Sequence, residues 1–233
     1  MARSLSHYVQ ALRRRLRSRF VCFGTLRSVD PVNQGFGIGR GTPIDRVYIE
    51  RFLSAHAAHI RGRVLEVGDR EYTDRFGVGV TKSDVLHVVA GDPAATIVGD
   101  LTDLAGVPDG SFDCIILTQT LHYVFDMPAA VREVHRILAP GGVALVTVPG
   151  LSQISRWDME RWGDRWRLTT LSARELFELA FPTASVEVAA FGNALAATAF
   201  VQGIPAERLR TRELDAQHED YEIVVAIAAE KPL

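Results

Sequence analysis

The chain has 233 residues, of which 47% are hydrophobic and 23% are charged, and its formal net charge is −2. This length and composition predict a soluble globular protein with one large domain, and they favour neither a second independent domain nor nucleic acid as a partner. Neither cysteine, Cys22 or Cys114, has a second Cys or a His at metal-ligand spacing, so we expect no disulfide framework and no bound metal.

The first twenty residues hold six arginines and no acidic residue. Apolar residues recur there at helical spacing, which predicts a basic amphipathic helix. They are Leu5, Val9, Leu12, Leu16 and Phe20. We expect this helix to lie on an acidic face of its own protein or of a subunit partner in a homodimer, with membrane-surface or nucleic-acid contact as the alternative. The sequence has neither the apolar region of a signal peptide nor a run of the roughly 18–20 apolar residues that span a membrane, which favours a cytoplasmic location.

Residues 1–41 are assigned to this helix and a glycine-containing linker, and residues 42–233 to the main domain. The main domain opens with an amphipathic helix predicted over 42–60, with Thr42 as N-cap and Pro43 in the first turn. Short β-type runs then alternate with helical patterns, which predicts an α/β fold whose sheet is covered on both faces. The strand candidates are residues 63–67, 85–89, 95–98, 112–118 and 142–148.

The later elements complete the sheet. Residues 126–142 (DMPAAVREVHRILAPGG) predict a helix with Pro128 in its first turn, followed by a right-handed crossover into the next strand. After Pro149 the sequence predicts a helix capped by Ser172, then strands within 184–192 and 220–231. Two adjacent antiparallel strands at the end would make a seven-stranded sheet, unlike a dinucleotide dehydrogenase, in which a second βαβαβ half follows.

An ordered series of motifs accompanies these strands: RVLEVG (63–68), TKSDVLHV (81–88), IVGDLTDL (97–104), DGSFDCIILTQTLHYVFD (109–126) and HRILAPGGVALVTVPG (135–150). Their order and spacing resemble the class I S-adenosylmethionine-dependent methyltransferases, in particular the type 11-like subgroup with DGSFD…LHYV…REVHRILAPGG. The resemblance covers roughly residues 42–180, and its specificity lies in the series. It implies a Rossmann-like seven-stranded, mostly parallel sheet flanked by helices, with an antiparallel final strand and extra N-terminal helices.

Polar residues are expected where the strands end, and ligands of open α/β sheets bind beyond the carboxyl ends of the strands. S-adenosylmethionine offers hydroxyl, amino and ammonium groups that carboxylates can bind, whereas carboxylates repel a phosphate. The resemblance implies the following cofactor contacts: Glu66 and Gly68 at the methionine moiety, Asp84 at the ribose hydroxyls, Asp100 and Leu101 at the adenine, and Gln119 near the transferring methyl. The alternative for the two aspartates is that they only cap turns.

The segment EVGDREYTDRFG (66–77) holds only two glycines where a nucleotide-binding protein carries a glycine-rich loop. Such loops matter most where the backbone must approach a pyrophosphate. S-adenosylmethionine has no phosphate and carries a sulfonium cation, so we interpret the segment as a compact variant of a methyltransferase loop with a crossover helix of about two turns. Asp69 and Glu71 replace small residues in it, and they point either away from the ligand or toward its ammonium group.

Further side chains are expected around the acceptor. His122 is a candidate to take a proton from an attacking hydroxyl, because imidazole titrates near neutral pH. It is alternatively a histidine at a helix start, and methyl transfer can also proceed by alignment alone. Residues 150–170 predict a lid whose aromatic and arginine side chains suit sugars, planar rings or carboxylates, unless its tryptophans pack onto the core. The candidate substrate or cofactor contacts are Arg46, Tyr48, Trp157, Trp162 and Trp166.

The function expected from the resemblance is S-adenosylmethionine-dependent methylation of a small molecule in biosynthesis. The acceptor is expected to be a hydroxyl on a sugar-containing or other specialised metabolite, with S-adenosylhomocysteine as product and no metal. The alternative is a non-catalytic protein of the same fold that binds or scaffolds a biosynthetic enzyme. A nicotinamide-dependent enzyme is disfavoured because the phosphate loop is absent.

Overall fold

The computed structural model describes residues 22–233. Its contacts divide the chain into two compact units, Met1–Val32 and Asn33–Leu233. The described part of the first unit contains a 3-10 helix, η1 (Gly24–Leu26). The basic helix expected within the first twenty residues lies outside the described residues, and the division at residue 41 stays a prediction.

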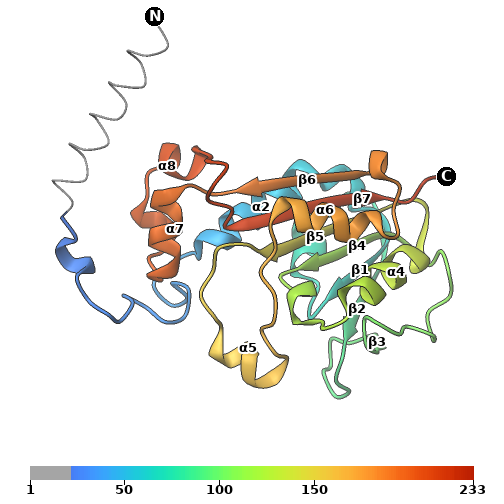
Figure 1. Cartoon of the computed structure of the whole chain (residues 1–233). Helices are drawn as coiled ribbons and strands as arrows, with labels where there is room; N and C mark the ends of the chain where they lie inside the picture. The colour runs from blue at the N-terminus through green and yellow to red at the C-terminus, as the bar shows by residue number, and fades with distance from the viewer. Residues whose placement is uncertain (1–21) are drawn as a thin grey trace, which may run out of the picture. The chain divides into compact units, whose positions relative to one another are not determined.

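Seven strands form one sheet in residues 33–233, in the order β3-β2-β1-β4-β5-β7-β6 (Figure 1). The strands are β1 (Gly62–Val67), β2 (Val80–His87), β3 (Ile97–Val98), β4 (Phe112–Thr118), β5 (Leu138–Pro149), β6 (Val186–Phe191) and β7 (Val224–Glu230). The first five are parallel to one another, and β7 runs antiparallel to both β5 and β6. The predicted mostly parallel sheet with an antiparallel final strand is confirmed. The strand order reverses between β1 and β4, and a crevice for ligands opens at the carboxyl ends there.

Helices cover both faces of the sheet, with α4 and α6 on one face and α2 and α7 on the other (Figure 1). The α-helices are α2 (Ile44–Ala55), α3 (Glu71–Phe76), α4 (Met127–Ile137), α5 (Arg156–Arg161), α6 (Thr170–Glu178), α7 (Ala194–Val201) and α8 (Thr211–Asp215), and the further 3-10 helices are η2 (Ala57–His59), η3 (Leu121–Tyr123), η4 (Thr183–Ser185) and η5 (Ala206–Arg208). In β4, Ile115 and Leu117 join one hydrophobic cluster and Cys114 and Ile116 the other. This alternation explains why the central strands are apolar at consecutive positions.

Two helix starts differ from the prediction. Thr42 is not the N-cap of α2, because its hydroxyl donates to Glu207 Oε1 at 2.7 Å and its N–H also donates to that carboxylate. Pro43 takes the N-cap position without a side-chain hydrogen bond. Helix α6 begins at Thr170 with Thr169 as its cap, and Ser172 is the reciprocal partner in a capping box rather than the cap itself.

At the carboxyl ends of the strands, the connection after β1 is short and the connection after β5 is long. The crossover helix α3 has six residues, which confirms the expected two turns. The segment from residue 150 to 167 leaves the sheet after β5 and returns to the same place, because the Leu168 N–H donates to the Pro149 carbonyl at 3.0 Å. It contains α5 and extends as a closed loop beyond the sheet edge (Figure 1).

Candidate active site

A cavity of about 320 Å³ lies at the carboxyl ends of β1, β4 and β5. This volume is that of a small-molecule site. Its wall comes from the N-terminal end of α2, the β1–α3 loop, η3 and the 150–167 segment. Six carboxylates line it against two arginines, and these residues are Asp45, Glu66, Asp69, Glu71, Asp158, Asp164, Arg46 and Arg167. The excess of carboxylates favours a ligand that carries positive charge.

Glu66 lies near the end of β1 and is only 2% exposed. Its Oε1 accepts the Tyr72 N–H at 3.1 Å, and its Oε2 accepts the Thr73 N–H at 2.8 Å and the Thr73 hydroxyl at 2.7 Å. Burial raises the pKa of this carboxyl, and the three hydrogen bonds oppose that rise. Glu66 therefore lines the cavity while its oxygens hold the start of α3, and its contact with a methionine moiety stays a prediction.

The loop after β1 turns at Gly68, whose φ of +90° suits glycine. The next residue, Asp69, accepts the Glu71 N–H through Oδ1 at 2.8 Å. Both Asp69 and Glu71 line the cavity, and whether they face a ligand's ammonium group stays a prediction. Arg46 reaches Glu71 from α2, with Nη1 at 3.3 Å from Oε1, and its guanidinium lies 5.6 Å from the centre of the Tyr72 ring.

Gln119 lines the cavity directly after β4 with a φ of +47°, in the left-handed region that non-glycine residues rarely adopt. Its N–H donates to the Thr147 carbonyl at 2.9 Å, which anchors the turn to the neighbouring strand. Backbone strain of this kind costs on the order of 1–3 kcal/mol and is concentrated at functional sites. The conformation supports the expectation that Gln119 faces a ligand.

His122 lies on η3, is 5% exposed and lines the cavity. Its Nε2 is 3.9 Å from Asp164 Oδ1, and its buried Nδ1 has no hydrogen-bond partner within residues 22–233. Burial lowers the pKa of His122 to about 4, against the attraction of Asp164. Burial alone would raise the pKa of Asp164, but hydrogen bonds from Arg167 and the Ser155 N–H lower it. The site therefore holds a neutral imidazole beside a carboxylate.

The low pKa of His122 predicts a loss of stability in acid. The unfolded chain protonates at the ordinary histidine pKa of 6.5, whereas the buried ring resists protonation until about pH 4, so acid favours unfolding in this window. His122 alone is expected to remove about 3 kcal/mol of unfolding free energy between pH 7.5 and 4. Urea unfolding gives the free energy of unfolding of wild type and of His122→Asn at each pH. The loss between pH 7.5 and 4 should be about 3 kcal/mol larger for the wild type than for the variant. Parallel pH profiles would show that the imidazole titrates normally.

Asp84 does not lie at a strand end, and the prediction of its position is wrong. It lies within β2, pairs in register with Leu65, and precedes the last residue of the strand, His87, by three positions. Its carboxylate accepts from Arg63 Nε at 2.7 Å and from the Thr96 hydroxyl at 3.1 Å. Burial would raise its pKa, but these contacts together lower it. The side chain is absent from the cavity wall.

Asp100 and Leu101 are also outside the cavity wall. Asp100 follows β3, and its Oδ1 accepts the Thr102 N–H at 2.8 Å and the Thr102 hydroxyl at 2.7 Å. Leu101 is buried in the core. The structure thus gives Asp100 the turn-capping position that was the alternative, and an adenine contact for either residue stays a prediction.

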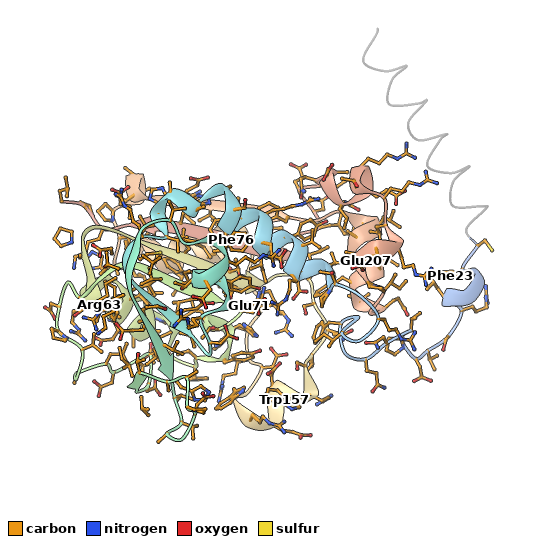
Figure 2. All side chains as sticks on the ribbon, turned by 180° about the vertical axis from the view of Figure 1, so that it is seen from behind. Phe23, Arg63, Glu71, Phe76, Trp157 and Glu207 are labelled. Carbon is orange, nitrogen blue, oxygen red and sulfur yellow. The ribbon has the colours of Figure 1, made fainter. Side chains whose placement is uncertain are left out.

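The aromatic contacts expected from Tyr48 and the three tryptophans do not reach the cavity. Tyr48 is fully buried on the inner side of α2 and stacks on Phe191 with ring centres 5.6 Å apart. Trp157 is exposed on α5 (Figure 2). Trp162 packs edge-on against His87, and Trp166 Nε1 donates a hydrogen bond to the Val124 carbonyl at 3.0 Å. Trp162 and Trp166 therefore hold the 150–167 segment in place through these contacts.

Polar residues of the same segment line the cavity instead, and the sequence interpretation missed them. They are Ser152, Gln153, Ser155, Asp158, Asp164 and Arg167. Arg167 pairs with Asp164 at 2.8 Å through Nη2, and the N–H groups of Arg165 and Trp166 both donate to the His122 carbonyl, at 3.2 and 3.3 Å. The available signal was the position of this segment directly after the end of β5.

Within residues 22–233, no group of three or more His, Cys, Asp or Glu side chains is arranged to hold a metal ion. The helices of that part of the chain are all too short or too polar to cross a bilayer.

Comparisons with known proteins agree with this architecture. A family model described as "Methyltransferase domain" matches residues 37–146. A 2-phytyl-1,4-naphtoquinone methyltransferase from Synechococcus elongatus is 30% identical over 151 residues, which are 60% of this chain and 64% of that protein. A malonyl-[acyl-carrier protein] O-methyltransferase from Serratia marcescens is 28% identical over 130 residues, 51% of this chain and 48% of that protein.

Among solved structures, an S-adenosylmethionine-dependent methyltransferase from Mesorhizobium loti matches with a TM-score of 0.53 and 19% identity, covering 81% of this chain and all of that one. This likeness concerns the fold. The chain spans between 28% and 64% of the length of the curated relatives it matches. The chain is thus similar over residues 37–146 to the methyltransferase family of that model, and its sheet topology is that of the class I S-adenosylmethionine-dependent methyltransferase fold.

Proposed function

We propose that the protein is an S-adenosylmethionine-dependent methyltransferase that methylates oxygen on a small polar acceptor, a sugar-containing or other specialised metabolite. The observation that carries this proposal is the cavity at the carboxyl ends of β1, β4 and β5, where carboxylates outnumber arginines six to two. A sulfonium and an ammonium group suit such a wall, whereas the phosphates of a nicotinamide cofactor would be repelled.

The residues of the cavity fit the cofactor and an acceptor in two halves. The half formed by α2 and the β1–α3 loop contains Asp69, Glu71 and Arg46, which offer partners for an amino acid. The half formed by η3 and the 150–167 segment contains hydroxyl, amide and carboxylate groups, which suit a polar acceptor better than a hydrocarbon. The two relatives named above act on a carrier-bound malonyl group and a naphthoquinone, and their names support a small acceptor for this chain.

The chemistry of transfer needs few protein groups. When bound, S-adenosylmethionine supplies a methyl group on a sulfonium that is already a good leaving group. The negative charge of Asp164 favours the tautomer of His122 with its proton on Nε2, so that Nδ1 is left as the acceptor. We assign to the His122 imidazole the proton released by the acceptor hydroxyl as its oxygen is methylated.

Calorimetric titration of the full chain tests the proposal. S-adenosylhomocysteine is expected to bind one site with a Kd in the micromolar range, as inferred from a cavity of this size with several charged contacts. NAD at the same concentration is expected to give no heat. Absence of binding by both S-adenosylhomocysteine and S-adenosylmethionine would contradict the proposal, and binding without turnover on any acceptor of a broad panel would favour the non-catalytic alternative. A homodimer and a cytoplasmic location are also part of the proposal and rest on the sequence alone.

A further inference from the structure

We infer that the acceptor carries a protonated amine, as an amino sugar does, and that Asp158 and the ring of Tyr123 bind this ammonium group. Asp158 then determines which acceptors bind, and it takes no part in the transfer step itself. This inference rests on the proposed function, because it assumes that the acceptor occupies the half of the cavity formed by η3 and the 150–167 segment.

Asp158 lies on α5 of the 150–167 segment and lines the cavity. It follows Trp157, whose exposed side chain is labelled in Figure 2, and successive residues of a helix point about 100° apart. One of the two side chains therefore faces solvent while the other reaches the cavity. The Asp158 N–H donates to the Ser155 hydroxyl at 3.3 Å, which fixes the start of the helix.

The charge of Asp158 is not compensated within residues 22–233, because its carboxylate forms no ion pair there. Two arginines of the same segment have other partners. Arg161 stacks on Trp157, with its guanidinium 3.9 Å from the centre of the ring, and Arg165 donates to backbone carbonyls. A carboxylate on a cavity wall without a cation of its own favours a cationic ligand.

The arginine in this half of the cavity is not available to an anionic acceptor. The two terminal nitrogens of Arg167 make four hydrogen bonds inside the protein, two to the Asp164 carboxylate and two to backbone carbonyls. Arg167 thereby also neutralises Asp164, and burial lowers the pKa of His122 to about 4, so its ring is uncharged at pH 7. The negative charge of Asp158 therefore remains, and it opposes an acceptor that carries a carboxylate or a phosphate.

Tyr123 supplies the second part of this subsite. It lies on η3 and lines the cavity, and its hydroxyl donates a hydrogen bond to the Asp158 carboxylate. Burial raises the pKa of Tyr123, and the charge of Asp158 raises it further, so the hydroxyl stays a neutral donor that orients the carboxylate. An ammonium group is attracted both by a carboxylate and by the face of an aromatic ring. The hydroxyl and amide groups of Ser152, Ser155 and Gln153 on the same wall suit the hydroxyls of a sugar.

Matched sugars test the inference on the full chain saturated with S-adenosylhomocysteine at pH 7. Glucose, 6-amino-6-deoxyglucose and glucuronate share one ring and differ at C6, where they are neutral, cationic and anionic, and galactose has the same three forms. Saturation-transfer NMR titrations give each dissociation constant. In at least one set the amine is expected to bind about tenfold more tightly than the neutral sugar and the carboxylate to bind weakest, because a hydrogen bond to a charged group contributes about this much.

Three variants separate recognition of charge from support of the loop. Asp158→Asn is expected to bring the three affinities within about twofold of one another, and Asp158→Lys to reverse their order, so that the carboxylate form binds best. Glu160→Gln is the control, because it removes an exposed carboxylate from the same helix outside the cavity wall, and it should keep the wild-type order. Circular dichroism checks that every variant is folded.

A wild type that binds the neutral or the anionic form as tightly as the amine, or that binds no amine of either set, would overturn the inference. Equal weakening of all three forms in Asp158→Lys would overturn it as well, because the residue would then only support the loop. Failure of the wild type to bind S-adenosylhomocysteine would contradict the proposed function itself, so the two failures are distinguishable.

Discussion

Replacing His122 by asparagine is expected to slow methyl transfer at least 100-fold, because general-base assistance contributes about 10²–10⁴-fold to such rates. The buried ring stays neutral at pH 7, since burial lowers its pKa to about 4. It is therefore a weaker base than the near-neutral imidazole expected from the sequence, but the acceptor hydroxyl becomes strongly acidic as its oxygen is methylated and can still release its proton to this ring. Single-turnover rates at saturating S-adenosylmethionine, on any acceptor that the wild type methylates, measure the effect. The affinity for S-adenosylhomocysteine should change less than threefold.

His218→Asn is the control, because this histidine is exposed and absent from the cavity wall. Its rate should equal that of the wild type. A His122→Asn enzyme that keeps a rate within threefold of the wild type would show that transfer depends on alignment of donor and acceptor, with no protein base.

Replacing Glu66 by alanine is expected to lower the free energy of unfolding by about 3–6 kcal/mol, since three donors lose their buried acceptor at once. Two of them are the N–H groups of Tyr72 and Thr73 at the start of α3, and Glu66 is the side chain that accepts from both. Urea unfolding at pH 7.5 gives the value, and binding of S-adenosylhomocysteine should weaken at the same time because the loop loses its fixed path.

Asp74→Ala provides the comparison for Glu66→Ala. It removes an exposed carboxylate from the same short helix, where it pairs with Arg70 on the surface. Its unfolding midpoint should remain close to that of the wild type, because exposed ion pairs contribute little. If the two variants lost similar stability, the hydrogen bonds of Glu66 would not be the support of α3 that the geometry indicates.

The sheet was predictable because its strands are apolar runs that differ sharply from their surroundings. Residues 112–118 were predicted with the bounds that β4 has, since both faces of this central strand are covered and five of its seven residues are buried and apolar. Strand β2 gave a weaker signal, because only its last two residues, Leu86 and His87, pair with the outer strand β3. Its polar first half, Val80 to Asp84, does not resemble a buried strand, and its pairing with β1 extends it beyond the predicted start. Asp84 was therefore expected at a strand end, whereas β2 ends at His87.

The candidate site was predictable only in part, because side-chain direction depends on more than position along the chain. Arg46 and Tyr48 are two residues apart on α2, which separates them by about 200° around the helix axis. Only one of them could face the cavity, and the apolar pattern of α2 assigns Tyr48 to the core. The direction of the 150–167 segment depends on long-range contacts such as Trp166 Nε1 to the Val124 carbonyl, which no local pattern encodes.

The hydrogen bond from Leu168 to Pro149 gives the 150–167 segment the character of an exchangeable cassette. Both ends of the loop meet at one point of the sheet, so a replacement loop of another length adds only a small closure entropy and leaves the strand order untouched. The polar residues that line the half of the cavity proposed for the acceptor belong to this cassette, whereas Asp69 and Glu71 belong to the short loop after β1. Acceptor preference could therefore diversify by exchange of a single loop, while the fold and the opposite half of the cavity stay the same.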